Sequence, residues 1–139
     1  MSDHLQTVPA NMPDYSSYIA GWKRRQQQEK AAIEKRRAKA REIAAQAVAI
    51  LKKHGATKVI LFGSVLDHTF KLDSDIDIAV EMPSAAWWEW YLKLGETLNF
   101  PIDLVNLGKI KSGFREIILQ FGEVLYDREE WRCRTTGAD

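Results

Sequence analysis

Polar and apolar residues follow a helical pattern over the first third of the chain. From about residue 15 to residue 54 there is no proline, and Ala, Gln, Glu, Lys and Arg, which favour helix, dominate. Apolar positions recur every three or four residues, and near Ile43 and Ala47 they are dense enough to pack on a sheet. Residues 23–41 are mostly polar and are expected to project from the body. Gly55 is the expected end of the helix.

Shorter elements follow, in which strand and helix patterns alternate. Ser84 is expected to cap the helix after the second strand, because its hydroxyl can accept a bond from a free amide of the first turn. We expect an α+β fold with a mixed sheet. The expected elements are a strand at 58–62, a strand at 75–80, a helix at 84–98, a strand at 102–105, a helix at 112–121 and a closing strand at 124–126.

Composition and charge indicate a small globular protein with a segregated charge. The 139 residues are 45% apolar and 28% charged, which suits one core. Between Gly21 and His54 there are eleven Lys or Arg and three Glu, so this stretch carries +8, and the rest carries about −7 to give the net +1. The basic helix leaves nucleic acid or an acidic protein as options for a partner. We expect a flexible tail (1–14), the basic helix (15–54), a core (55–127) and a C-terminal tail (128–139).

Other features disfavour membrane, secreted and zinc proteins. No apolar run approaches the roughly 20 residues that span a bilayer. The residues around Asp3 and His4 lack the features of a signal peptide, so we expect a cytoplasmic protein. Cys133 is the single cysteine and cannot form an internal disulfide, and the three histidines are too scattered for a zinc site.

Two aspartates in the second expected strand are the first candidates for chemistry. Asp75 and Asp77 are two residues apart, so both side chains are expected on one face, with Ile76 on the other. Two close carboxylates repel each other unless a cation lies between them. Ligands that are all oxygen favour Mg²⁺ or Mn²⁺. The alternative is a turn, in which Asp-Ser-Asp sequences are common.

Two further features belong to the first and third expected strands. Gly63-Ser64 follows the first strand, where glycine lets a phosphate approach the backbone and the serine hydroxyl can bind it. An ordinary turn is the alternative. Asp103 lies between aliphatic residues of the third strand and needs a partner unless it faces solvent on an edge strand. If the strands are neighbours, Asp103 joins Asp75 and Asp77.

Together these motifs resemble the nucleotidyltransferase superfamily of DNA polymerase β, and within it the minimal nucleotidyltransferases. The resemblance covers roughly residues 59–126. It rests on the Leu-Phe-Gly-Ser segment that ends at Ser64, on the strands at 74–80 and 101–105, and on the closing stretch at 117–126. The long basic helix and the tryptophan-rich start of the following helix lie outside the usual pattern.

The resemblance implies a polymerase-β-type nucleotidyltransferase core with a long N-terminal helix. Asp75 and Asp77 would hold two Mg²⁺ ions, with Mn²⁺ as an alternative, and Asp103 would ligate the second ion and help to activate the attacking hydroxyl. Gly63 and Ser64 would hold the β- and γ-phosphates of ATP. Relatives of this kind commonly act as antitoxins that transfer AMP from ATP to a tyrosine of a HEPN-domain ribonuclease toxin. A hetero-oligomer with such a toxin is therefore expected.

Three other functions stay open at this point. The chain could neutralise a toxin by binding alone, transfer a nucleotide to a small molecule, or extend a nucleic-acid end. Lys71 and Arg115 could reach phosphates or be solvated surface cations, and His68 is most simply a loop histidine. The aromatic cluster at residues 87–91 is expected to divide between the core and a partner-facing surface, with adenine stacking as an alternative.

Overall fold

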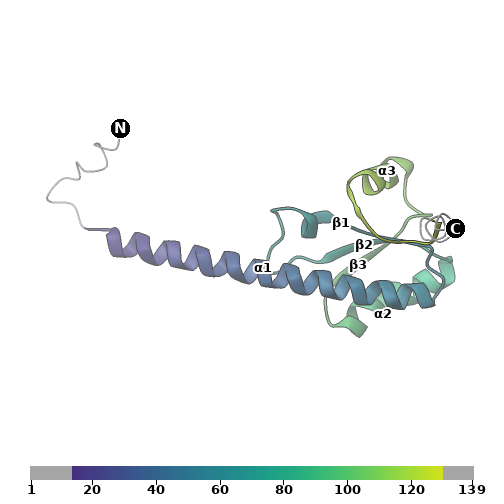
Figure 1. Cartoon of the computed structure of the whole chain (residues 1–139), viewed down its shortest axis with the longest axis horizontal. Coiled ribbons are helices and arrows are strands. Elements are labelled where there is room, and N and C mark those ends of the chain that lie inside the picture. The colour runs from purple at the N-terminus through teal and green to yellow at the C-terminus, as the bar shows by residue number, and fades with distance from the viewer. Residues whose placement is uncertain (1–13, 130–139) are drawn as a thin grey trace, which may run out of the picture. The chain divides into compact units, whose positions relative to one another are not determined.

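The computed structural model describes residues 14–129, which are coloured in Figure 1. The chain divides into two compact units, Met1–Ala32 and Ile33–Asp139. The tails expected at 1–14 and 128–139 therefore lie almost entirely outside the described residues. The elements, in chain order, are α1 (Ser16–Lys53), β1 (Lys58–Phe62), the short 3-10 helix η2 (Gly63–Leu66), β2 (Ile76–Glu81), α2 (Ser84–Leu98), β3 (Ile102–Asn106), α3 (Ser112–Phe121) and β4 (Glu123–Asp127).

The described part of the first unit is the beginning of α1, whose side chains are exposed. Asp14 caps the helix, since its Oδ1 accepts a 2.9 Å hydrogen bond from the Ser16 N–H. Tyr18 and Trp22 are 70% and 50% exposed. Between residues 14 and 129, no helix combines the length and the apolar character that crossing a membrane requires. The helix therefore depends here on its own backbone bonds and on residues of high helix propensity.

Four strands form one mixed sheet in the order β3-β2-β1-β4. β1 pairs antiparallel with β2 and with β4, whereas β2 pairs parallel with β3. Parallel neighbours need a crossover connection, and α2 supplies it between β2 and β3. The expected α+β fold with a mixed sheet is confirmed, and β3 is an edge strand.

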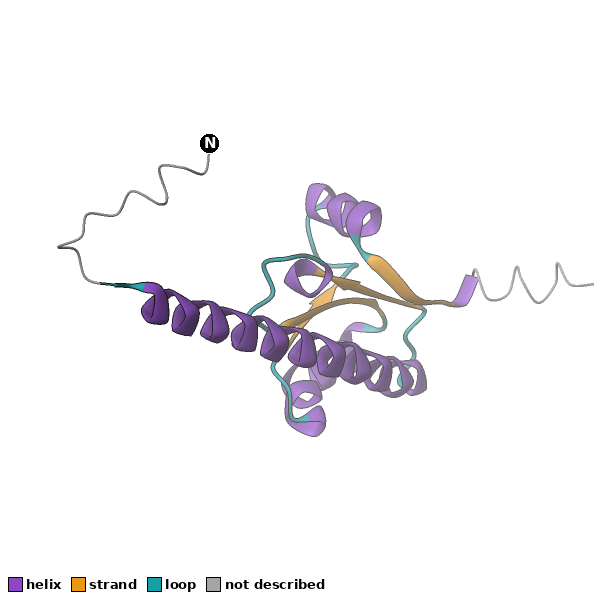
Figure 2. Ribbon diagram, turned by 60° about the vertical axis from the view of Figure 1, so that its left-hand side comes forward, coloured by secondary structure: helices purple, strands orange, loops and turns teal. Residues whose placement is uncertain are grey.

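The two faces of the sheet are covered unequally (Figure 2). On one face the C-terminal part of α1 and α2 pack on strand residues such as Ile76 and Ile78 and form the larger core. On the other face α3 contributes a single fully buried side chain, Ile118, which packs with Ile60 and Ala79. Side chains alternate along a strand, so this second face is also the one that carries Asp77.

The observed elements differ from the expected ones in two places that matter. β2 begins at Ile76, so Asp75 is the last residue before the strand. α2 begins at Ser84 itself, and the expected N-cap role of Ser84 is wrong. Pro83 occupies the cap position and makes no side-chain bond, while its carbonyl accepts the Trp87 N–H at 2.9 Å and so starts the helix one residue earlier.

The middle of α1 also departs from the expectation of a projecting polar helix. From Ile33 onward the helix belongs to the second unit and packs in its larger core, where Ile33 is half-buried and Ala40 is fully buried. A helix with alanine on its inner face can approach a sheet closely. The helix then ends before Gly55, whose φ of +97° is a left-handed conformation that favours glycine, as expected.

Candidate active site

The three aspartates predicted from the sequence meet at one end of the sheet. Asp77 of β2 is the register partner of Asp103 of β3, and a parallel register places both side chains on the same face. Ile76 and Ile78 point to the opposite face and are fully buried. Asp75 immediately precedes β2 and is exposed, as is Asp103, whereas Asp77 is half-buried. The structure therefore brings Asp77 and Asp103 together, with Asp75 close enough for its charge to act on Asp77.

The surroundings of Asp77 destabilise its ionised carboxylate. Burial, and then the negative charges of Asp103 and Asp75, raise the pKa of Asp77 to about 6. Its ionised form is thus less stable than that of an ordinary aspartate, and a bound cation would relieve the repulsion. A perturbed carboxylate with two acidic neighbours on an open face is typical of functional sites.

Gly63 lies directly against the carboxylate of Asp77. Its backbone has a φ of +83°, a conformation that side chains rarely adopt. A Cβ atom at this position would overlap the Asp77 Oδ2 atom. The register of β1 and β2, in which Phe62 faces Asp77, brings the turn to this place. The expected Gly63-Ser64 turn therefore lies beside the carboxylates.

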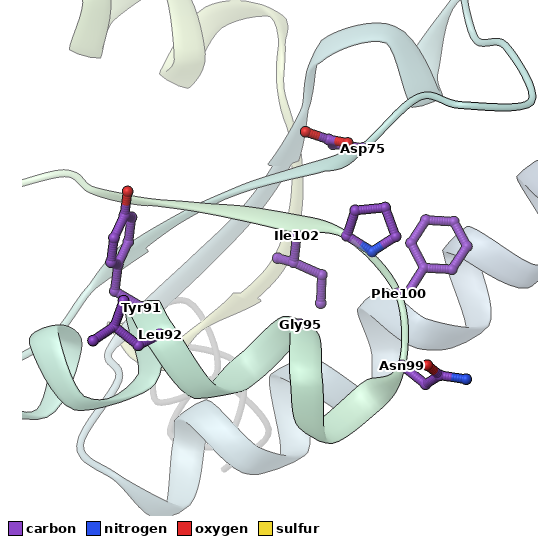
Figure 3. A pocket seen from close by; sticks show the side chains of 8 residues that line it. Asp75, Tyr91, Leu92, Gly95, Asn99, Phe100 and Ile102 are labelled. Atoms are coloured by element: carbon purple, nitrogen blue, oxygen red, sulfur yellow. The ribbon is translucent and has the colours of Figure 1, made fainter.

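Two clefts border these residues. The first has a volume of about 460 Å³, lies between α2 and the start of β3, and has Asp75 in its lining. Figure 3 shows Tyr91 on α2 and Phe100 just before β3 as parts of its wall. The second cleft, of about 380 Å³, is lined by Gly63 and by apolar side chains of α3 such as Phe114. The site is thus accessible from two sides.

The donor set suits a divalent cation that arrives with further ligands. Among residues 14–129, no group of three or more Asp, Glu, His or Cys side chains is arranged to hold a metal ion by itself. Mg²⁺ prefers oxygen donors, and in nucleotide sites one or two carboxylates commonly bind it while substrate phosphates and water complete its shell. The uncompensated charge around Asp77 therefore fits a metal that binds together with a nucleotide.

The weaker polar candidates lie apart from this cluster or face solvent. Arg115 is at the other end of β2, where its Nη2 atom is 3.6 Å from the Glu81 Oε2 atom. His68 and Lys71 are exposed in the loop between η2 and β2. The structure therefore adds no support for a phosphate contact by Arg115.

The aromatic cluster on α2 divides between core and surface. Trp87 is half-buried, and its indole N–H donates to the Leu104 carbonyl of β3 at 3.2 Å. Trp88 and Tyr91 are 59% and 42% exposed, with their rings nearly parallel at 9° and their centroids 5.8 Å apart. Tyr91 also lines the cleft beside Asp75, so this exposed pair lies next to the site.

Arg36 and Arg37, which lie in the part of the helix that was expected to project, also contact the connection between β1 and β2. Arg36 donates to the Ser74 carbonyl, and Arg37 donates to carbonyls of the loop that follows Gly63. A signal was present in the spacing, because Arg37 is four residues after Ile33 and three before Ala40 and so falls on the buried stripe of α1.

A comparison with known families identifies the family to which the chain belongs. Residues 45–131, more than half of the chain, match the family described as Polymerase beta, Nucleotidyltransferase. The chain belongs to this nucleotidyltransferase family. The matched segment contains all four strands and the five residues expected in the site. Curated protein sequences gave no match.

Solved structures also resemble this nucleotidyltransferase. A chain from a crystal structure of a toxin–antitoxin with AMP-PNP is 26% identical, has a TM-score of 0.54, and aligns over 68% of this chain and 85% of that chain. A structure assigned as a minimal nucleotidyltransferase is 26% identical with a TM-score of 0.50, over 65% of this chain and 92% of the other. The second structure, together with the family match, confirms the resemblance to minimal nucleotidyltransferases.

A third structure supports the fold alone, because its sequence identity is 23%. It contains a tri-AMPylated Shewanella oneidensis HEPN toxin in complex with an MNT antitoxin. The alignment has a TM-score of 0.51 and covers 71% of this chain and 85% of that chain.

Proposed function

We propose that this protein is the antitoxin of a HEPN/MNT pair and transfers AMP from ATP to a tyrosine of its HEPN-domain toxin. One observation carries the proposal: Asp75, Asp77 and Asp103 converge beside the Gly63-Ser64 turn in a chain of this family. Nucleotidyl transfer needs groups that position a triphosphate and cations that compensate its charge. The Gly63-Ser64 turn suits the first task, and the carboxylates would hold the metal ions for the second.

Each of these residues has a role in the proposed reaction. Asp75 and Asp77 would hold two Mg²⁺ ions, for which Mn²⁺ is an alternative, and Asp103 would ligate the second. Bound there, the ions would supply positive charge for the α-phosphate and for the entering and leaving oxygens. Gly63 lets the turn lie against the Asp77 carboxylate and would hold the β- and γ-phosphates through its backbone together with Ser64, which offers a hydroxyl and an amide.

The chemical step is an in-line displacement at phosphorus. The phenolic oxygen of the tyrosine forms a bond to the α-phosphorus as the bond from that phosphorus to the α–β bridging oxygen breaks. Pyrophosphate leaves with the electron pair of that bond. The phenolic proton passes towards Asp103, which is exposed on the edge strand β3. The products are an adenylylated tyrosine and pyrophosphate.

Two features support a protein acceptor. The clefts of about 460 and 380 Å³ reach Asp75 from one side and Gly63 from the other, which leaves openings for a nucleotide and for an acceptor segment. Among the similar structures, one toxin–antitoxin contains AMP-PNP and another contains a tri-AMPylated HEPN toxin with its MNT antitoxin. Both points agree with transfer of AMP to a bound toxin.

The test is an adenylylation assay with ATP labelled at the α-phosphate. The full chain is incubated with Mg²⁺, labelled ATP and the HEPN-domain protein encoded beside its gene, and the Asp75→Asn/Asp77→Asn double variant is assayed in parallel. We expect label on the toxin only with the unchanged chain. Peptide mapping by mass spectrometry then identifies the modified residue, which we expect to be tyrosine.

The same assay separates the other functions. A stable complex without label, in which the double variant still neutralises the toxin, would indicate an antitoxin that acts by binding alone. Label on RNA ends or on an added small molecule, with none on the toxin, would assign a different acceptor. Loss of ATP binding in the double variant with its fold intact would place the carboxylates in the nucleotide site.

A further inference from the structure

Two adjacent arginines of α1 contact the two ends of the connection between β1 and β2, which carries part of the site. Arg37 contacts the end that begins at Gly63, and Arg36 contacts the end at Asp75. Successive residues of an α-helix point about 100° apart, so neighbours can contact different parts of one connection. Both arginines and this connection belong to the second compact unit, Ile33–Asp139.

Arg37 holds the end of the short helix η2. Its Nη1 donates to the Val65 carbonyl, and its Nη2 donates to the Asp67 carbonyl at 2.8 Å. The last carbonyls of a helix lack partners within the helix, so the guanidinium supplies them. The guanidinium also lies 5.4 Å from the ring centroid of Phe70, which is fully buried. Arg37 thereby fixes the course of the chain just after Gly63.

Arg36 holds the peptide bond next to Asp75. Its Nη2 donates to the Ser74 carbonyl at 2.8 Å, and its guanidinium carbon lies 4.3 Å from the ring centroid of Phe100. Ser74 is also fixed through its hydroxyl, which accepts the Lys71 N–H at 2.8 Å. The Ser74 carbonyl belongs to the peptide that joins it to Asp75, so this contact sets the direction in which the chain enters β2.

Arg36 is half-buried and keeps its contacts with Ser74 and Phe100 although one of its donors is unsatisfied. Its Nε atom is buried and, within the described residues, makes no hydrogen bond. A buried donor without a partner costs free energy. The side chain therefore occupies a place that suits Ser74 and Phe100 better than it satisfies its own donors.

We propose that Arg36 and Arg37 are positioning residues for nucleotidyl transfer. Arg37 places Gly63 and Ser64 for the triphosphate, and Arg36 places Asp75 for the metal, so the inference rests on the function proposed above. Neither guanidinium contacts substrate in this proposal. Arginine suits the task because its planar fork can bond two carbonyls at once, which the single ammonium of lysine does less well.

The test compares substitutions along one helix in the full chain. Arg36→Met and Arg37→Met remove the donors, and Arg36→Lys and Arg37→Lys keep the charge. Arg41→Met is the matched control, because Arg41 lies on the same helix and its Nη1 makes an exposed 2.9 Å ion pair with Glu123 of β4. The measurements are amide hydrogen exchange, Mg-ATP binding by calorimetry, and the kcat and KM of AMP transfer.

We expect each arginine to affect the segment that it contacts. Arg37→Met should speed exchange at residues 64–67 and raise the Kd and KM for ATP about tenfold, the scale expected when hydrogen bonds from a charged group are lost. Arg36→Met should speed exchange at residues 73–76, lower kcat about tenfold and raise the Mg²⁺ concentration for half-maximal activity. The lysine variants should recover part of each effect.

The outcomes distinguish this inference from the proposed function. Folded Arg36→Met and Arg37→Met proteins that match Arg41→Met in loop exchange and Mg-ATP affinity would overturn the inference. So would an equal rise in exchange over the whole second unit, which would indicate general destabilisation. If the unchanged chain binds no ATP while the arginines still protect their loops from exchange, the proposed function fails and the loop contacts stand as structural.

Discussion

Gly63 and Asp77 approach each other so closely that no side chain fits at the glycine. A Cβ atom there would overlap the Asp77 Oδ2 atom, and the Gly63 φ of +83° is unfavourable for other residues. The turn after β1 and the central carboxylate of the site are therefore coupled through one contact. A change at either residue should alter the other.

Gly63→Ala tests this coupling. We expect a loss of about 2–4 kcal/mol in the free energy of unfolding, because the variant combines an unfavourable φ with a steric overlap. We also expect Mg-ATP binding to be lost, since Asp77 must move. Urea unfolding followed by circular dichroism and calorimetric titration with Mg-ATP measure the two effects.

Gly113→Ala is the matched control for that substitution. Gly113 lies in the first turn of α3, and a Cβ atom there would meet nothing within 4 Å. Alanine in a helix is favoured over glycine by up to about 1 kcal/mol, so stability should be unchanged or slightly higher and Mg-ATP affinity unchanged. Equal behaviour of the two variants would mean that the space beside Asp77 is not needed.

Asp77→Asn should make the metal-free protein more stable at neutral pH. Burial and the charges of Asp103 and Asp75 raise the pKa of Asp77 to about 6, above the usual 3.8. Its contribution to stability is therefore fully present below about pH 3.8 and is lost as the pH rises through 6. At pH 7.5 in EDTA we expect a gain of about 1 kcal/mol for the variant, after allowing for solvent screening of this half-exposed group.

The stability gain of Asp77→Asn should shrink as the pH falls towards 4.5. With Mg-ATP at pH 7.5 the unchanged protein should become the more stable of the two, because Mg-ATP stabilises only that protein. Urea unfolding at both pH values provides the measurement. Asp67→Asn is a control for which the expected change in stability has the opposite sign, because hydrogen bonds from Thr69 lower the pKa of Asp67. A variant at Asp77 that loses stability at pH 7.5 in EDTA would show that the carboxylate is favourably compensated without metal.

The core of the fold and the acidic cluster could be predicted because they depend on local patterns. The alternation from Ile76 to Val80 fixes which side chains enter the core, and therefore that Asp77 lies on the other face. A glycine at the end of a buried strand marks a turn. The prediction that Asp77 and Asp103 lie close together required one more assumption, that their strands pair. The parallel register of β2 and β3 confirms this assumption.

The carbonyl partners of Arg36 and Arg37 could not be predicted, because they depend on long-range packing. Arg36 bonds a residue 38 positions away, and Arg37 bonds one 28 positions away. In the sequence both belong to a basic run that resembles a solvated helix face. Only the three-dimensional path of the loops around Val65 and Ser74 reveals which of the cations have carbonyl partners.

Asp103→Asn should separate catalysis from nucleotide binding. Asp103 is exposed at the start of an edge strand, so we expect the fold and the ATP affinity to be retained. AMP transfer should fall at least about 100-fold, the scale of a lost general base. The assay with labelled ATP and the toxin measures transfer, and calorimetry measures affinity.

Asp73→Asn is the control for Asp103→Asn. It removes a charge from an exposed loop position nearby and should change transfer less than about twofold. Similar rates for the two variants would exclude Asp103 from the chemical step.

Ile118→Ala tests how α3 is held on the sheet face that carries Asp77. Ile118 is 1% exposed and packs with Ile60 and Ala79 in the smaller core, whereas its neighbour Leu119 is 40% exposed. We expect Ile118→Ala to cost about 3 kcal/mol in urea unfolding and Leu119→Ala less than about 1 kcal/mol. Because Ala79 is two residues from Asp77, the first variant should also speed amide exchange in β2. Equal costs for both variants would mean that α3 is not held through this core, and that the cleft beside Gly63 keeps its shape by other contacts.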